Sequence, residues 1–282
     1  MIPFYEQPVL HLGPVAIHAF GALVALGIFI GMQMTLRRAK FENLDPQRDE
    51  DLIWYAVLIG FISAHVFDLV TYYPERILEN PLSLLKIWDG ISSFGGMLGG
   101  LGGMMFFFWR KMPETNWATR MRYVDTIAFG WPFAWVFGRS GCTVAIDHPG
   151  TISKFFLTIS LKTEAAQDFI RGVYENRGMA DKLPADLSQY GFHNLGLYEM
   201  LYTLLILVPI WLILGRKHRP PGFFLALFFL LYLPARFTLD FFRMADATYG
   251  GLTPAQWACI PVVVLAGVLL VNMRKWAAQA EA

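Results

Sequence analysis

The sequence predicts an all-α integral membrane protein with seven transmembrane helices and a small extracytoplasmic head insertion. Of its 282 residues, 55% are hydrophobic and only 16% are charged, whereas a soluble domain carries about a quarter charged residues. The apolar residues gather in runs long enough to cross a bilayer. The lysines and arginines gather between those runs, which is typical of a multi-pass protein.

Seven apolar runs are expected to form the spans. They cover residues 15–36, 52–73, 92–109, 123–138, 195–215, 222–242 and 254–273. The third run is short, and its glycines between Gly95 and Gly103 recur at helical spacing. Such spacing permits close approach of two helices, so we expect tight packing there. We treat residues 1–282 as one membrane domain, with a head insertion at 151–192.

Basic residues set the expected orientation. They cluster in the loops 37–50, 110–122 and 216–221 and after residue 273. By the positive-inside rule these segments are cytoplasmic, which puts the N-terminus outside and the C-terminus in the cytoplasm. The loop 74–91 and the segment 139–194 then face outward. We expect residues 1–14, which carry only Glu6 as a formal charge, to lie along the outer interface.

Composition also excludes some classes of protein. The formal net charge is +1, and no basic face or tail stands out, which argues against a nucleic-acid partner. Cys142 and Cys259 are too few for a disulfide framework and lack the spacing of a metal pair.

The stretch from Gly130 to Gly150 begins as an apolar helix and then presents Arg139, Cys142, Asp147 and His148. A charge at membrane depth is costly unless it meets a partner, so intramembrane ionisable residues are functional candidates. We treat Arg139 as the first of them. The safer interpretation of Cys142 is a small apolar filler.

A second charged group lies in the sixth span. Arg236, Asp240 and Arg243 share one stripe at i, i+4 and i+3 spacing. An internal salt bridge is the simplest interpretation, but Arg139 and these residues together leave surplus positive charge. A guanidinium binds phosphate in a two-pronged geometry, so we predict an anionic phospholipid headgroup as the missing partner. Glu199 opens the fifth span, where a structural role and a chemical one are equally open.

His65 and Asp68 lie three residues apart near the outer end of the second span. They share a helix face, and Asp147 and His148 offer a second carboxylate and imidazole at the same membrane surface. This set can supply a general base oriented by an acid. A minority alternative is that the four residues hold a transition metal. A mutually satisfied structural pair is the other interpretation of His65 and Asp68.

With these residues in view, the chain resembles the bacterial prolipoprotein diacylglyceryl transferases from about residue 12 to residue 275. The resemblance rests on the order and spacing of several motifs. They are Ile17-His-Ala-Phe20-Gly21, Arg37-Arg38-Ala39, Ile91-Ser-Ser-Phe94-Gly95-Gly96, Asp125, Gly138-Arg139-Ser-Gly141, His193 to Glu199, Arg236 to Asp246, and Gln256.

The resemblance implies a seven-span bacterial inner-membrane enzyme with an outside N-terminus and a periplasmic head. It implies transfer of the diacylglyceryl group of phosphatidylglycerol to the lipobox cysteine of a prelipoprotein, with no cofactor. On the same resemblance, Arg139 and Arg236 engage the lipid phosphate, and Glu199, Asp240 and Arg243 are supporting polar residues.

The chain also departs from the family pattern. Phe94 and Phe20 stand where the family usually has His and Tyr, and Cys142 replaces an Asn. Phenylalanine can neither accept the thiol proton nor hold a headgroup. We therefore predict a changed acid–base apparatus made of His65, Asp68, Asp147 and His148.

Three hypotheses follow from the sequence. The first is a phospholipid-dependent transferase, acting on a prelipoprotein cysteine or on another acceptor. The second is a phospholipid-binding homologue without catalysis. The third is a metal-dependent lipid-modifying enzyme that uses His65, Asp68, Asp147 and His148.

Overall fold

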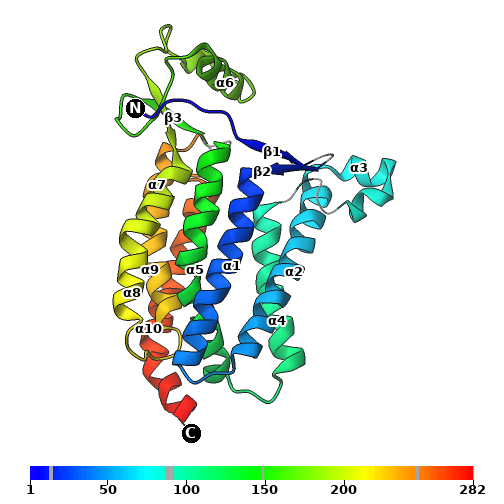
Figure 1. Cartoon of the computed structure of the whole chain (residues 1–282), viewed down its shortest axis with the longest axis vertical. Helices are drawn as coiled ribbons and strands as arrows, with labels where there is room; N and C mark the ends of the chain where they lie inside the picture. Colours follow the sequence, from blue (N-terminus) through cyan, green and yellow to red (C-terminus); the bar gives the residue numbers. More distant parts are fainter. Residues whose placement is uncertain (13–14, 87–89, 91, 148, 245–247, 282) are drawn as a thin grey trace.

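The computed structural model describes residues 1–12, 15–86, 90, 92–147, 149–244 and 248–281. Its main body is a bundle of long helices running side by side, with a small head at one end (Figure 1). The long helices are α1 (Ala19–Phe41), α2 (Pro46–Tyr72), α4 (Ser93–Lys111), α5 (Trp117–Ala145), α7 (Leu195–Tyr202) continued by the π-helical turn η3 (Thr203–Leu207) and α8 (Val208–Leu214), α9 (Phe223–Leu239) and α10 (Pro254–Glu281).

Five helices in the described part of the chain are long and apolar enough to cross a membrane. They cover Ala19–Phe41, Pro46–Tyr72, Leu195–Leu214, Phe223–Phe242 and Pro254–Met273. The helices α4 and α5 run alongside them in the bundle (Figure 1). The structure therefore confirms the predicted helical membrane protein.

Helix α5 is longer than the predicted span 123–138. Asn116 caps its start by accepting a hydrogen bond from the Thr119 N–H at 2.8 Å. At the other end the helix continues to Ala145, because nothing breaks it before the left-handed Ile146. The hydroxyls of Ser140 and Thr143 donate to carbonyls four residues back at 2.8 Å, which satisfies them within the helix. Arg139 therefore lies on a helix rather than after one.

The pair α2 and α4 packs through glycines, so the tight packing predicted for the third span is confirmed, with α2 as its partner. A Cβ on Gly60 would lie 3.1 Å from the Gly96 carbonyl, and one on Gly103 would lie 2.5 Å from the Tyr55 carbonyl. The Gly103 distance leaves no room for a side chain, and the Gly60 distance is tighter than an ordinary van der Waals contact. The absence of side chains at these positions thus sets the spacing of the two helices.

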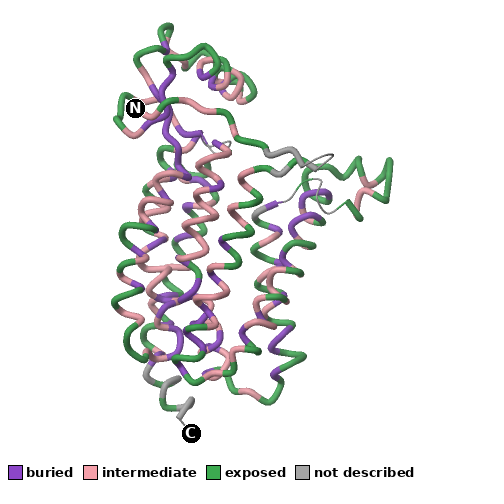
Figure 2. The backbone as a smooth tube through the Cα atoms, viewed as in Figure 1, coloured by how far each residue is buried: buried purple, intermediate pink, exposed green. Residues whose placement is uncertain are grey.

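After α2, a short arm projects sideways from the bundle, at the same end as the head (Figure 1). It consists of α3 (Pro74–Glu79) and the 3₁₀ turn η1 (Pro81–Leu85). No described residue of the two elements is buried, and Leu78 is 85% exposed (Figure 2).

The head is a small three-stranded antiparallel sheet in the order β3-β5-β4, with one helix beside it. The elements are β3 (Pro149–Ser153), β4 (Ile159–Ser160), α6 (Glu164–Glu175), η2 (Ala180–Lys182) and β5 (Gly191–Asn194). Its core contains Ile159, Leu161, Ile170 and Phe192, all nearly inaccessible. Strand β5 runs directly into α7, so no loop separates the head from the bundle at this point.

The N-terminal segment is attached to the head. Ile2 pairs in parallel with Ile159 of β4, and the Tyr5 hydroxyl donates to the Thr143 carbonyl at 2.7 Å. The antiparallel hairpin of β1 (Val9–Leu12) and β2 (Val15–His18) then leads into α1. The expected interfacial segment 1–14 thus makes specific contacts with the head and the end of α5. The C-terminus lies at the opposite end of the bundle (Figure 1).

Candidate functional site

Arg139 and Arg236 reach one buried carboxylate, that of Glu199, from two different helices. Arg139 Nε lies 2.9 Å from Glu199 Oε2, and Arg236 Nη1 donates to Glu199 Oε1 at 2.8 Å. Glu199 is only 2% exposed. The structure therefore brings the two predicted arginines together, and a protein carboxylate lies between them.

The position of Glu199 follows from the contact between the first turn of α7 and the last turn of α5. Asn194 caps α7 by accepting from the Leu197 N–H at 3.2 Å, and its Nδ2 donates to the Thr143 carbonyl at 3.0 Å. A Cβ on Gly196 would lie 2.8 Å from the Thr143 nitrogen. Because only a glycine allows this approach, the helix start lies against α5 and Glu199 meets Arg139.

Tyr232 and Trp135 complete the surroundings of Arg139. The Tyr232 hydroxyl donates to Glu199 Oε2, and Arg139 Nη2 lies 3.5 Å from the Tyr232 oxygen. The Arg139 guanidinium stacks over the Trp135 ring, 4.5 Å from its centroid. Tyr232 precedes Arg236 by four residues and Trp135 precedes Arg139 by four, so each aromatic lies one turn below an arginine.

Arg139, Arg236, Glu199, Asp240 and Arg243 form one cluster of charged side chains, in which Asp240 is the second carboxylate. Its Oδ1 lies 3.1 Å from Arg236 Nη2 and 3.8 Å from Arg243 Nη1. The Thr253 hydroxyl donates to Asp240 Oδ2, and Gln256 Oε1 accepts from the Thr253 N–H at 2.9 Å. The residue that precedes α10 thus holds one oxygen of this carboxylate, while the arginines contact the other.

The cluster has more positive than negative charge. Within the ion pairs of the described residues, three guanidiniums (Arg139, Arg236, Arg243) face two carboxylates (Glu199, Asp240), which leaves a formal surplus of one positive charge in these pairs. Removing charge from water is expensive unless it is neutralised. The internal salt bridges considered from the sequence are therefore present, and one further anion would balance the cluster.

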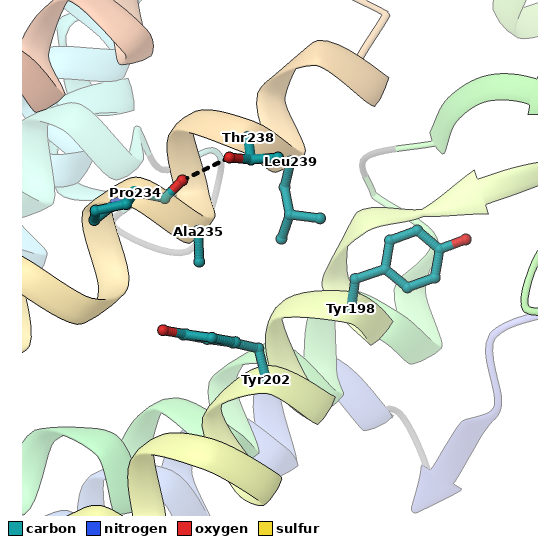
Figure 3. A pocket seen from close by; sticks show the side chains of 6 residues that line it. All are labelled: Tyr198, Tyr202, Pro234, Ala235, Thr238 and Leu239. Carbon is teal, nitrogen blue, oxygen red and sulfur yellow. Dashed lines mark hydrogen bonds between the residues drawn. The ribbon is translucent and has the colours of Figure 1, made fainter.

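A cavity of about 400 Å³ lies between α7 and α9, next to this cluster. Tyr198 and Tyr202 line it from α7, and Pro234, Ala235, Thr238 and Leu239 line it from α9 (Figure 3). The Thr238 hydroxyl donates to the Pro234 carbonyl at 2.9 Å, so the wall is largely apolar. Its lining residues Tyr198 and Ala235 directly precede Glu199 and Arg236 in the chain. An apolar chain in this cavity would therefore lie beside the arginines.

Cys142 lies on the same side of α5 as Arg139, with 3.7 Å between its Sγ and Arg139 Nη1. Asp147 follows the end of α5 and interacts with the Cys142 thiol. A carboxylate thus approaches the arginine cluster through Cys142. The neighbouring His148 lies outside the described residues.

His65 and Asp68 lie on α2, under the arm. The His65 ring is fully buried, and its two nitrogens contact backbone carbonyls, Nδ1 with Gly90 at 3.0 Å and Nε2 with Ser83 at 3.1 Å. Asp68 is also buried, and its carboxylate lies against Gly90. His65 therefore contacts backbone carbonyls of Gly90 and of Ser83 in the arm rather than pairing with Asp68, and neither ring nitrogen is left for a ligand.

The metal alternative gains no support from the described residues. Among them, no group of three or more His, Cys, Asp or Glu side chains is placed to hold a metal ion. His65 and Asp68 lie on α2, Asp147 follows α5, and α1 lies between these two helices (Figure 1).

The two phenylalanines that depart from the family pattern occupy different places. Phe94, at the start of α4, is 55% exposed and packs edge-on against Phe67 with centroids 5.4 Å apart. Phe20 lies against the turn of α5 that carries Arg139, because a Cβ on Gly141 would be 3.1 Å from its ring. Neither ring offers a proton acceptor.

His193 is a titratable group that the sequence did not single out for the site. It lies on β5 above the cavity, and its Nδ1 is 2.8 Å from the Tyr198 hydroxyl. The rings of Phe155 and Phe242 lie 6.2 and 4.9 Å from it. Burial among these groups lowers the pKa of His193, because the charged imidazolium loses hydration.

Comparison with known proteins decides the family. Residues 7–272 match the family model described as prolipoprotein diacylglyceryl transferase. The chain belongs to the prolipoprotein diacylglyceryl transferase family. It is 31% identical to the phosphatidylglycerol–prolipoprotein diacylglyceryl transferase of Photorhabdus laumondii over 95% of this chain and 92% of that protein. It is 30% identical to the enzyme of Serratia proteamaculans, over 95% and 92%, and 28% identical to that of Tolumonas auensis, over 96% of both chains.

Membership of the diacylglyceryl transferase family confirms the resemblance seen in the sequence. Tyr232 and Trp135 were missed as site residues because aromatic side chains are common throughout this chain. Their spacing of four residues before Arg236 and Arg139 was the available signal. Thr253 was equally hidden, because it approaches Asp240 only when α10 folds back beside α9.

Proposed function

We propose that this chain transfers the diacylglyceryl group of phosphatidylglycerol to the cysteine thiol of a prolipoprotein. The relatives named above carry that activity in their names. The observation that carries the proposal is the convergence of Arg139 and Arg236 on Glu199 beside an apolar cavity. A positively charged cluster next to an apolar space suits an anionic lipid.

In the reaction, the arginines hold the phosphate of the lipid. The acceptor sulfur bonds to the glyceryl carbon that carries the phosphate, and the carbon–oxygen bond to the phosphate breaks. Glycerol phosphate leaves with the electron pair of that bond, and the thiol proton passes to a base. Because negative charge builds up on the leaving phosphate, preorganised guanidiniums stabilise the transition state more than the ground state.

Glu199 positions the arginines for this role. Without a lipid, its carboxylate holds both guanidiniums at a fixed separation, so they need no rearrangement to meet a phosphate. Supporting roles for Asp240 and Arg243 follow from the contact of Asp240 with Arg236 and the contact of Arg243 with Asp240. The five residues therefore form the proposed headgroup site.

For the base, we favour Asp147 and His148 over His65 and Asp68 within the predicted set of four. Asp147 interacts with Cys142 next to Arg139. His65 has one ring nitrogen in contact with the Ser83 carbonyl of the arm and the other in contact with the Gly90 carbonyl. For His148, the support for a role as the base is its position next to Asp147 in the sequence.

We also propose that the chain crosses a bacterial inner membrane seven times as one domain, 1–282, with 151–192 as an insertion. The five apolar spans, together with α4 and α5 beside them, make seven crossing segments. The basic loops 37–50, 110–122 and 216–221 then lie in the cytoplasm, and the N-terminus, the arm and the head lie outside.

The test uses the purified full-length protein in mixed micelles with phosphatidylglycerol and a lipobox peptide. We expect glycerol phosphate release to match the gain of one diacylglyceryl mass by the peptide. A peptide with serine in place of the cysteine is the control. Arg139→Lys and Arg236→Lys keep the charge but lose the two-pronged geometry, so turnover should fall about 100-fold or more. Arg110→Lys, at an exposed position on α4, should leave turnover unchanged.

Two results would contradict the proposal. Binding of phosphatidylglycerol without product from any thiol peptide would favour the non-catalytic homologue. Loss of turnover on chelation, restored by a stoichiometric metal, would favour the metal-dependent alternative.

A further inference from the structure

Two parallel stripes of aromatic rings lead down from the two arginines. On α5 the stripe is Trp131, Trp135 and Arg139, and on α9 it is Phe228, Tyr232 and Arg236. Within α5 the two indoles stack at 5.4 Å, and within α9 Phe228 and Tyr232 stack at 4.9 Å. Across the helices, Trp135 meets Tyr232 edge-on at 5.9 Å, and Trp131 meets Phe228 at 6.4 Å.

The α5 stripe carries one donor, the Trp135 indole N–H, that no described residue satisfies. Trp135 Nε1 and Arg139 Nε are both buried and have no hydrogen-bond partner among the described residues. Arg139 Nε still has the ion pair with Glu199, but the indole N–H of Trp135 has no charged partner. In the hydrocarbon region no water is present to satisfy a free donor, so an unmatched N–H is costly. Such a donor calls for an acceptor from outside the chain.

We propose that the Trp135 indole N–H binds an ester carbonyl of the diacylglyceryl group during transfer. The inference rests on the proposed function and adds a second contact to it. Trp135 lies one helical turn, about 5.4 Å, deeper than Arg139. In a phospholipid the ester carbonyls lie just deeper than the phosphate, on the next glyceryl carbons. A lipid whose phosphate meets Arg139 therefore presents its ester carbonyls at the level of Trp135.

The same stripe continues as an apolar surface below the ester level. Trp131 is 42% exposed, and the Trp135 ring keeps partial exposure, so a lipid along the stripe can contact both rings. An indole is suited to this depth, because it joins an apolar ring to a single donor.

The experiment compares two forms of phosphatidylglycerol in the full-length protein. One is the ordinary diester, and the other is a dialkyl form whose ether oxygens replace both ester groups. We expect wild-type kcat/KM to favour the diester about fivefold, the worth of one neutral hydrogen bond. In Trp135→Phe, which keeps a ring and removes the N–H, the ratio should fall to within about twofold of one, through KM for the diester. Trp131→Phe should keep the wild-type ratio.

Two outcomes would overturn the inference. One is an unchanged diester-to-diether ratio in Trp135→Phe, which would mean that the face of Tyr232 accepts the N–H. The other is an equal loss on both lipids, which indicates packing alone. If the wild type turns over neither lipid, the proposed function fails separately. In that case the ratio of the Kd values for the diester and the diether lipid, compared between wild type and Trp135→Phe, decides whether the indole N–H binds the ester.

Discussion

The site around Glu199 and the pair of α2 with its arm both place ionisable side chains at membrane depth, but they satisfy them differently. Around Glu199, charges from α5, α7 and α9 meet, with one positive charge in excess among the ion-paired side chains that the structure describes, and the nearby Trp135 N–H has no acceptor among the described residues. Under the arm, both nitrogens of His65 contact backbone carbonyls of the same chain. The site around Glu199 lacks an anion to balance its charge, whereas the ring nitrogens of His65 already contact acceptors within the protein.

This difference separates a binding site from a structural contact. An intramembrane charge is a functional candidate by default, and the sequence marks His65 as strongly as Arg139. What distinguishes them is whether the polar atoms of each site already have hydrogen-bond or charge partners within the protein. A hydrogen-bond donor without an acceptor in the protein indicates a ligand, whereas a donor that already has one indicates a structural role.

The largest expected effect comes from removing the carboxylate that the arginines share. In Glu199→Ala, two partly buried guanidiniums lose their partner, so the free energy of unfolding should fall by about 3–5 kcal/mol. Denaturant unfolding in detergent measures this. Glu175→Ala, at an exposed carboxylate of α6, should change stability by no more than about 0.5 kcal/mol. A similar small change in Glu199→Ala would show that the arginines do not depend on this carboxylate.

The second effect tests whether α2 and α4 form a rigid pair. In Gly103→Ala the new methyl would lie 2.5 Å from the Tyr55 carbonyl, and overpacking of this kind should cost about 2–3 kcal/mol. Gly102→Ala is the matched control, because nothing lies within 4 Å of a Cβ at that position. Equal stability of the two variants would mean that the helices separate easily.

The third effect separates the two roles considered for His65. His65→Ala leaves the Ser83 and Gly90 carbonyls without their contacts, which should cost about 1–2 kcal/mol. We expect faster hydrogen–deuterium exchange across 76–86 and less than a tenfold loss of turnover. A loss of about 100-fold with unchanged exchange would instead identify His65 as the general base.

The smallest effect is a pH dependence in the head. Burial lowers the pKa of His193, so the unfolded chain takes up a proton near pH 6.5 before the folded chain does. Stability from this group is therefore complete above about pH 6.5 and declines as the pH falls below it. The thermal midpoint should drop more between pH 7 and 5.5 in the wild type than in His193→Asn. Identical drops would remove His193 from the pH response.

The helical membrane class, the family and the arginines could all be predicted from the sequence. Run length and the placement of basic residues indicate spans without any knowledge of packing, because the bilayer imposes one length on every helix. Glycine spacing likewise indicated close helix packing of the third span, whereas its partner, α2, is known only from the structure. The end of α5 could not be placed, because Ser140 and Thr143 satisfy themselves within the helix and extend it past the last apolar residue.

The sequence by itself determined that Arg139 and Arg236 need an anionic partner. Only the tertiary structure decided that Glu199 already lies between them, that His65 is used by the arm and that the Trp135 N–H is left unmatched. The physical reason is that the residue type fixes the donors, acceptors and charge of each side chain. The folding of distant helices against one another decides how much of it remains for a ligand.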